Sequence, residues 1–160
     1  MNARVATALR CSLMFLVSAV AYAGSAQWNL HPTSGDWNTA ANWTPMTVPN
    51  GAADVATFGL SNTTTVSISA NTEVDAIMFA PGNSGYTITV DPFLVLTISG
   101  TGVTGAGRFV PLHDVNDDGG AIVFLNSSTA GDSNIVLDDG GFNDVYRQLH
   151  CGQRDHRSGC

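Results

Sequence analysis

The chain has 160 residues, and its 13 acidic side chains outnumber its six basic ones, all of which are arginines. Between residues 24 and 144, twelve carboxylates face a single cation, Arg108, which gives this stretch a formal charge of −11. This charge repels phosphate backbones and anionic headgroups, so nucleic acid and acidic membranes are not expected partners. The stretch also lacks cysteine, so we expect packing rather than disulfides to stabilise it.

Residues 1–23 have the layout of a secretory signal peptide. Arg4 and Arg10 supply a positive start, residues 11–20 form a short apolar run, and Ala21-Tyr22-Ala23 offers a small-x-small cleavage site. The run is shorter than the roughly 20 residues that a membrane-spanning helix needs. Gly24-Ser25-Ala26 offers a second cleavage site, but we expect cleavage after Ala23, export, and a mature chain that does not span the membrane.

Three tryptophans precede the predicted strands, at Trp28, Trp37 and Trp43. Two interpretations are open. The indoles can cover the apolar end of a strand stack, which makes residues 24–50 an N-terminal cap. Alternatively, exposed indole faces can stack on sugars, which makes the same residues a carbohydrate-binding platform. The cap is the more common use of clustered tryptophans.

The following residues have the pattern of β-strands, because β-branched and aromatic residues alternate with small polar ones between turn-forming clusters. Residues 65–69, TVSIS, and 86–90, YTITV, each predict one buried and one exposed face. No helical periodicity is evident. The predicted strands are 55–58, 65–69, 74–79, 86–90, 94–99, 121–125 and 134–137.

These strands recur every ten to twenty-odd residues without an exact letter repeat. The spacing is compatible with a parallel β-solenoid, in which coils of roughly 20 residues stack their apolar columns. A β-sandwich is the alternative, but the Asn-Gly hairpin signal occurs only at residues 50–51. We therefore predict an all-β fold: a parallel β-solenoid over residues 51–144 behind the tryptophan-rich cap.

Several blocks of the chain resemble the start of bacterial autotransporter-type passenger proteins with β-strand repeats. These blocks are SGDWNTAANW (34–43), VPNG (48–51), DVATF (54–58), TEV (72–74) and LTISG (96–100), and the segment FLNSSTAG (124–131) is similar to the later repeat units of these proteins. The resemblance covers residues 27–141, most of the mature chain. It implies a secreted or surface-displayed β-solenoid with a structural or adhesive role, and it implies no catalytic residues.

We therefore predict an exported structural or adhesin-like protein that is secreted or located at the bacterial cell surface. We do not expect it to be an enzyme. Extracellular glycans or other cell-surface proteins are the expected partners. A carbohydrate-binding module is the first alternative, and a polysaccharide-active β-helix enzyme is the second. Binding to immobilised glycans or release of reducing ends would distinguish these alternatives.

Residues 114–119, DVNDDG, reproduce the first half of a calcium-binding loop. Asp114, Asn116 and Asp118 occupy the first, third and fifth positions, and a glycine follows for the sharp turn. Position 12 is Leu125, so the carboxylate that completes an EF-hand is missing. A solvated acidic turn is the preferred interpretation, and weak calcium binding stays open.

Three further motifs are not expected to carry chemistry. Residues 100–105 match G-x-G-x-x-G, but no helical pattern follows, so a glycine-rich corner is predicted instead of a dinucleotide site. Gly131-Asp132-Ser133 is similar to an esterase nucleophile block, but the only histidines after it lie at residues 150 and 156. The acidic pairs at 117–118 and 138–139 fall in turns, and neighbouring strand residues point to opposite faces.

Residues 145–160 differ in composition from the rest of the chain, because they hold three of the six arginines and two of the three cysteines. We expect an aberrant tail from a frameshift or truncation, or a disordered or disulfide-closed terminus. A zinc cluster of Cys151, Cys160 and the two nearby histidines has suitable donor types, but its spacing matches no standard module.

Overall fold

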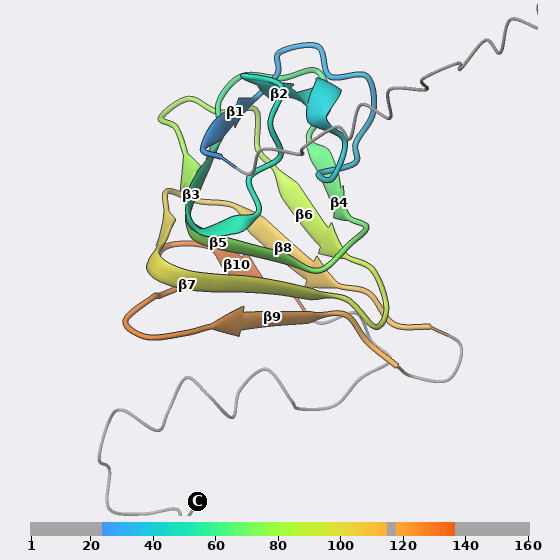
Figure 1. Ribbon diagram of the computed structural model, residues 1–160, viewed down its shortest axis with the longest axis vertical. Helices are drawn as coiled ribbons and strands as arrows, with labels where there is room; N and C mark the ends of the chain where they lie inside the picture. The colour runs from blue at the N-terminus through green and yellow to red at the C-terminus, as the bar shows by residue number, and fades with distance from the viewer. Residues whose placement is uncertain (1–23, 115–117, 137–160) are drawn as a thin grey trace, which may run out of the picture.

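The computed structural model describes residues 24–114 and 118–136, and β-strands make up nearly all of their regular structure (Figure 1). A six-stranded sheet A has the order β2-β1-β3-β5-β7-β9, and a four-stranded sheet B has the order β10-β8-β6-β4. One short 3-10 turn, η1 (Ala40–Asn42), accompanies them. The strands are β1 (Ala26–Trp28), β2 (Trp43–Thr44), β3 (Gly51–Phe58), β4 (Thr65–Ile68), β5 (Thr72–Phe79), β6 (Thr87–Val90), β7 (Val95–Thr104), β8 (Arg108–Pro111), β9 (Ala121–Phe124) and β10 (Asn134–Ile135).

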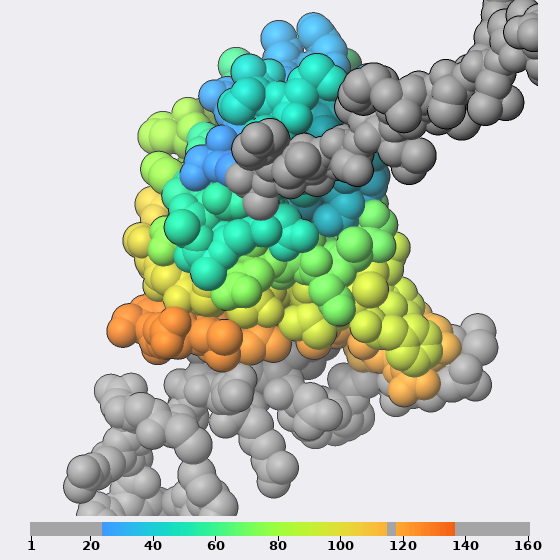
Figure 2. Space-filling view, viewed as in Figure 1, coloured from blue at the N-terminus to red at the C-terminus, as the bar shows by residue number. Residues whose placement is uncertain are grey.

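From β3 onward the chain alternates between sheet A and sheet B, and each strand pairs in parallel with the strand one coil away. This arrangement is a parallel β-solenoid, which confirms the predicted fold class. A sandwich of hairpins would instead pair strands that follow one another, in antiparallel. Three coils are complete in the described residues, and β9 and β10 belong to a fourth. In Figure 2 the coils are seen as stacked bands of colour, from the N-terminal residues in blue to the last described residues in orange.

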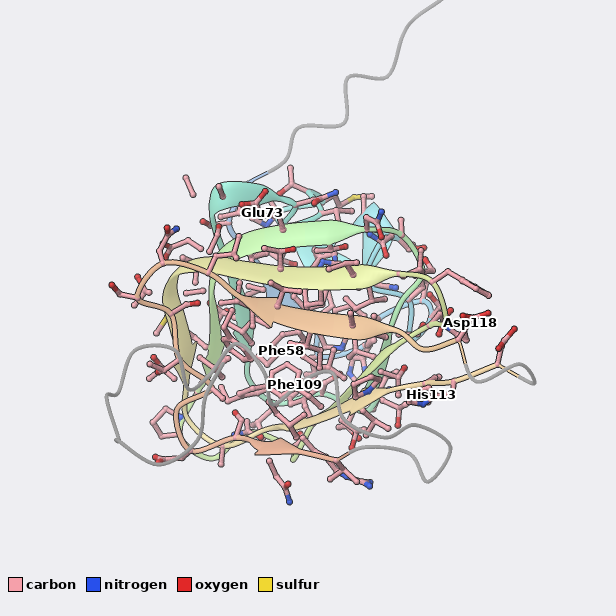
Figure 3. The ribbon with its side chains drawn as sticks, turned by 90° about the horizontal axis from the view of Figure 1, so that it is seen from below. Phe58, Glu73, Phe109, His113 and Asp118 are labelled. Carbon is pink, nitrogen blue, oxygen red and sulfur yellow. The ribbon has the colours of Figure 1, made fainter. Side chains whose placement is uncertain are left out.

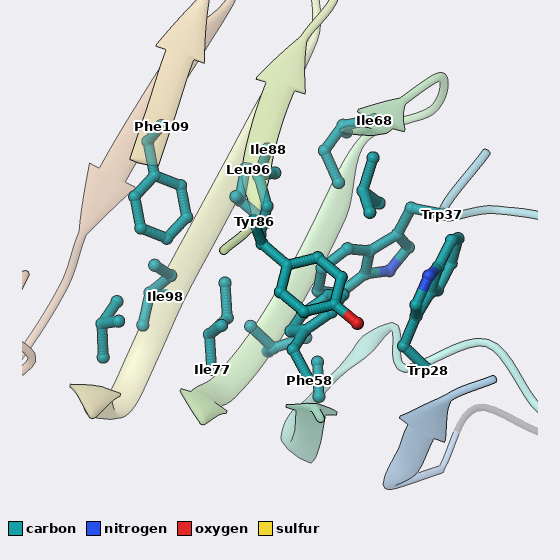
Figure 4. Packing of buried hydrophobic residues seen from close by; sticks show 14 of the residues in the cluster. Trp28, Trp37, Phe58, Ile68, Ile77, Tyr86, Ile88, Leu96, Ile98 and Phe109 are labelled. Carbon is teal, nitrogen blue, oxygen red and sulfur yellow. The ribbon is translucent and has the colours of Figure 1, made fainter. Parts of the chain in front are cut away.

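The alternation seen in the sequence sets the inside and outside of sheet B. Val66, Ile88 and Phe109 lie opposite one another on successive strands, and all three are fully buried. Thr65 and Thr87, one residue earlier, lie on the outer side. Each buried aliphatic or aromatic side chain contributes about 1.5–3 kcal/mol, so this column is a main source of stability. Figure 4 shows Ile88 and Phe109 within the cluster.

Sheet A is less regular, because its long strands bend at Asp75. Val74 pairs with Ile98 but Ala76 pairs with Gly102, so three residues of β7 lie opposite this one aspartate. The Asp75 carboxylate accepts hydrogen bonds from the Thr101 N–H (3.2 Å) and hydroxyl (3.0 Å). A Cβ on Gly100 would lie 1.7 Å from Asp75 Oδ1, so any larger residue there would displace this carboxylate. The G-x-G-x-x-G sequence therefore forms this bend and the end of β7, and a strand follows it, not a helix.

The sequence did not predict β1, β2 or β8. The first two are only three and two residues long, too short for an alternation to be visible. The third, β8, contains Pro111, a residue type that strand interiors disfavour, but here it is the last residue of the strand and pairs with Val90. A proline that closes a strand removes no donor from its interior.

The domain boundaries predicted at residues 1–23 and 145–160 fall outside the described residues. Residue 137, which ends the last predicted strand, also lies outside the described residues. The same holds for Cys151 and Cys160, the cysteines of the zinc cluster considered above. Within the described part, no helix has the length and apolar character that crossing a bilayer requires.

Candidate functional site

The three tryptophans of the cap lie together at the N-terminal end of the solenoid. Trp43 packs edge-on against Trp28 and Trp37, with ring centroids 5.0 and 4.9 Å apart, and all three contact Phe58 of β3. This geometry is the one that aromatic quadrupoles favour. Their exposed fractions are only 0–1%. A sugar needs an open ring face, and these indoles have none, so their burial speaks against the stacking interpretation.

Each indole N–H of the cap donates to a backbone carbonyl. Trp28 Nε1 donates to Thr63 O (3.0 Å), Trp37 Nε1 to Pro49 O (2.9 Å) and Trp43 Nε1 to Trp37 O (2.7 Å). A buried polar group without a hydrogen-bond partner destabilises the folded state, and these bonds remove that penalty for the three buried indoles. They also tie the cap to the connections that precede β3 and β4.

Asn42 organises the loop between β1 and β2. It is fully buried, and its Oδ1 accepts from the Thr33 N–H, the Thr33 hydroxyl and the Ser34 N–H at 2.8–3.1 Å. Its Nδ2 donates to Ser34 Oγ (2.9 Å) and Asp36 O (2.7 Å). The loop thereby presents Asp36 to Ser67 as an added parallel bridge on sheet B. Asn42 is thus a structural residue that sequence reasoning did not single out.

The described residues at the two ends of the predicted calcium loop pair with each other between β8 and β9. His113 and Gly119 pair in antiparallel, Asp114 N donates to Asp118 O (3.0 Å), and Asp118 N donates to Asp114 Oδ1 (2.9 Å). Asn116 lies outside the described residues. In the described part of the chain, no three His, Cys, Asp or Glu side chains are grouped as metal ligands. Figure 3 shows His113 and Asp118 at this corner.

The esterase-like block at residues 131–133 has a structural role. The Ser133 hydroxyl accepts from Gly107 N (3.3 Å) and lies 3.4 Å from Gly105 O, so it joins neighbouring coils. Among the described residues, no histidine hydrogen-bonds to it, and His31 instead contacts Asn62. Asp117 and the pair at 138–139 lie outside the described residues.

Besides the three tryptophans, Tyr86 is a buried aromatic residue with a polar group. Its ring centroid lies 4.8 Å from that of Phe58, and its hydroxyl has no hydrogen-bond partner. Burial raises the pKa of the Tyr86 phenol above its usual value near 10. The residue belongs to the core and faces no open site, so this perturbed pKa is not a catalytic signal.

The corner between β6 and β7 was not singled out from the sequence. Here Phe93 has a φ of 64° and an exposed fraction of 66%. Asp-Pro at residues 91–92 is a turn signal, but no letter of the sequence indicates that the next residue takes a left-handed conformation.

Comparisons with protein-family models, with curated proteins and with solved structures find no match to this chain. Function is therefore inferred from the geometry of the described residues. In the described residues, hydroxyls, amides and carboxylates mostly join turns and coils, and no nucleophile, base and oxyanion donor converge. This arrangement suits display of turns on a rigid scaffold.

Proposed function

We propose that the chain is an exported structural or adhesin-like protein, of the autotransporter passenger type, which acts at the bacterial cell surface or outside the cell and is not an enzyme. The observation that carries this proposal is the solenoid itself. Stacked parallel coils with a closed aromatic cap form an extended scaffold whose turns face solvent. Loops on a rigid scaffold are where binding residues are commonly placed.

Charge supports an extracellular role for such a scaffold. Twelve carboxylates with a single arginine between residues 24 and 144 keep neighbouring molecules apart and favour solubility. The apolar run at 11–20 with its cleavage signal supports export. The resemblance to passenger proteins supplies the adhesive or structural role.

Expression of the full chain in a Gram-negative host tests export. We expect a processed product outside the cytoplasm whose N-terminal residue is Gly24. Leu13→Asp combined with Leu16→Asp should leave an unprocessed chain in the cytoplasm, because two charges abolish the apolar run. Ser12→Ala is the matched control and should be processed normally. Cytoplasmic retention of the unaltered chain with residues 1–23 intact would contradict the proposal.

Adhesion and activity are measured on the exported product. We expect beads coated with it to be retained on bacterial or host-cell surfaces, and no reducing ends to be released from plant or bacterial polysaccharides. Sustained release of reducing ends would replace the adhesive proposal with the enzyme alternative.

A further inference from the structure

The corner that leads from sheet B to sheet A lengthens from coil to coil. Three residues join β4 to β5, four join β6 to β7, and nine join β8 to β9. The second connection, residues 91–94, is a β-turn in which Leu94 N donates to Asp91 O at 3.2 Å. We call these four residues the Phe93 turn. Longer connections at one corner of a regular coil are where binding residues are commonly placed.

The backbone of the Phe93 turn is one that phenylalanine disfavours. Pro92 is the second residue of the turn, and Phe93, with a φ of 64°, is the third. A turn with proline second and a positive φ third is type II, and its third residue is normally glycine or asparagine. The other positive-φ residues in the described part follow this rule: they are Gly82, Gly85, Gly102, Gly105, Gly131 and Asn126.

Burial does not compensate for the strain at Phe93. The side chain is 66% exposed, so little of the ring packs against the core. Among the large exposed apolar residues of the described part, it is the sole aromatic one. A strained backbone that holds an exposed ring is explained neither by conformational preference nor by packing, and such outliers cluster at ligand-binding sites.

Polar groups surround the Phe93 turn. Phe93 N donates to Gly119 O (3.2 Å), which joins the turn to the connection between β8 and β9. The His113 ring lies over Gly119, since a Cβ there would be 2.6 Å from His113 Nε2. Asp91 belongs to the turn, and the exposed Asp118 adjoins Gly119. The Phe93 turn therefore lies beside residues that carry carboxylates and an imidazole.

This combination fits a sugar ring better than a protein surface. A pyranose presents a C–H face that can pack on the negative face of an aromatic ring, while its hydroxyls donate to carboxylates. A protein partner would need roughly 800 Å² on each side, with a core depleted of charge, whereas the acidic residue Asp91 belongs to this turn and Asp118 adjoins Gly119, to which the turn is hydrogen-bonded. The net charge of −7 opposes anionic glycans.

We propose that the Phe93 turn, with His113 and Asp118 beside it, is a binding site for neutral glycans. The proposal rests on the proposed function, because it names the ligand class that the exported adhesive scaffold recognises. It moves carbohydrate recognition from the buried tryptophans to the corner where an aromatic ring is exposed.

Phe93→Asn tests the site, because asparagine accepts a positive φ and removes the ring. The full chain as exported is applied to immobilised neutral glycans, namely glucans, mannans, galactans and chitin oligosaccharides, with polyuronates as the anionic comparison. We expect binding to at least one neutral glycan, a loss of at least tenfold in affinity for Phe93→Asn, and a rise in the melting temperature of the same variant. A gain in stability together with a loss of binding is not expected of a purely structural residue.

Three further variants keep the test decisive. Phe93→Trp retains a stacking ring and should keep binding, whereas Phe93→Ala should lose it without the full gain in melting temperature. Leu60→Ala, at an exposed leucine elsewhere, should bind as the unaltered chain does. Absence of neutral-glycan binding by the folded chain, or unchanged binding by Phe93→Asn, would overturn the proposal. The export assay is scored separately, so failure of this site is distinguishable from failure of the proposed function.

Discussion

The aromatic cap and the Phe93 turn use aromatic residues in opposite ways. In the cap, three indoles are buried, their N–H groups are paired with carbonyls, and their rings meet edge to face. In the turn, one ring is exposed and its backbone is strained. The difference teaches that the most visible aromatic cluster of this sequence serves stability, while the candidate ligand contact is a single phenylalanine in a short turn.

Removing a ring from the cap should have the largest effect on stability. Trp43 is fully buried between the other two indoles, so Trp43→Ala leaves a large cavity and should lower the free energy of unfolding by about 3–5 kcal/mol. Urea denaturation followed by circular dichroism measures this. Met46→Ala, three residues away at a 70% exposed position, is the matched control and should change stability by less than about 0.5 kcal/mol. Equal effects of the two substitutions would contradict the role assigned to the cap.

The bend of sheet A should be nearly as sensitive to a single methyl group. Gly100→Ala places a Cβ 1.7 Å from Asp75 Oδ1 and should cost about 1–3 kcal/mol through overpacking and loss of the bonds to Thr101. The double variant with Asp75→Ala should recover part of this loss, because the carboxylate that collides is gone. A double-mutant cycle in urea measures the coupling, and strictly additive effects would show that the two residues do not meet at this bend.

The sequence predicted the fold better than it predicted the site, for a physical reason. Alternation of apolar and hydroxyl residues, as in TVSIS and YTITV, reports which side of a strand is buried, and the scarcity of hairpin signals favoured parallel coils. Trp28, Trp37 and Trp43 were correctly named as a cluster, but composition does not tell whether an indole face is open. That depends on Phe58, a residue of the next coil, covering the rings.

The left-handed residue of the Phe93 turn was beyond sequence reasoning for a related cause. Asp-Pro signals a turn, yet the sign of φ at the next residue depends on how the chain enters β7 and on the Gly119 carbonyl that accepts from Phe93 N. Likewise, the role of Gly100 depends on Asp75, 25 positions earlier in the chain. Contacts between coils, rather than local preference, decide both positions.

Relief of strain in the Phe93 turn should stabilise the protein by a smaller amount. A residue other than glycine or asparagine in the left-handed region costs about 1–2 kcal/mol, so Phe93→Asn and Phe93→Gly should raise the free energy of unfolding by up to about 1 kcal/mol. Phe93→Ala keeps a Cβ without the tolerance of asparagine and should gain less. Thermal unfolding of the three variants measures the order. Destabilisation by Phe93→Asn would mean that packing of the ring, and not strain, dominates at this corner.

Tyr86 provides the smallest effect at neutral pH and a pH-dependent comparison with the indoles of the cap. The indole N–H groups are paired, whereas the buried Tyr86 hydroxyl is not, so Tyr86→Phe should leave stability at pH 7 unchanged or slightly increased. Burial raises the folded-state pKa of Tyr86 above its unfolded value near 10. The contribution of Tyr86 to the free energy of unfolding is therefore fully present below pH 10. It is lost as pH rises through the folded-state pKa, because the phenol ionises first in the unfolded chain. Urea denaturation at pH 7, 9 and 11 should show a steeper loss for the unaltered chain than for Tyr86→Phe. Parallel pH profiles would indicate that the Tyr86 phenol ionises as readily in the folded core as in the unfolded chain.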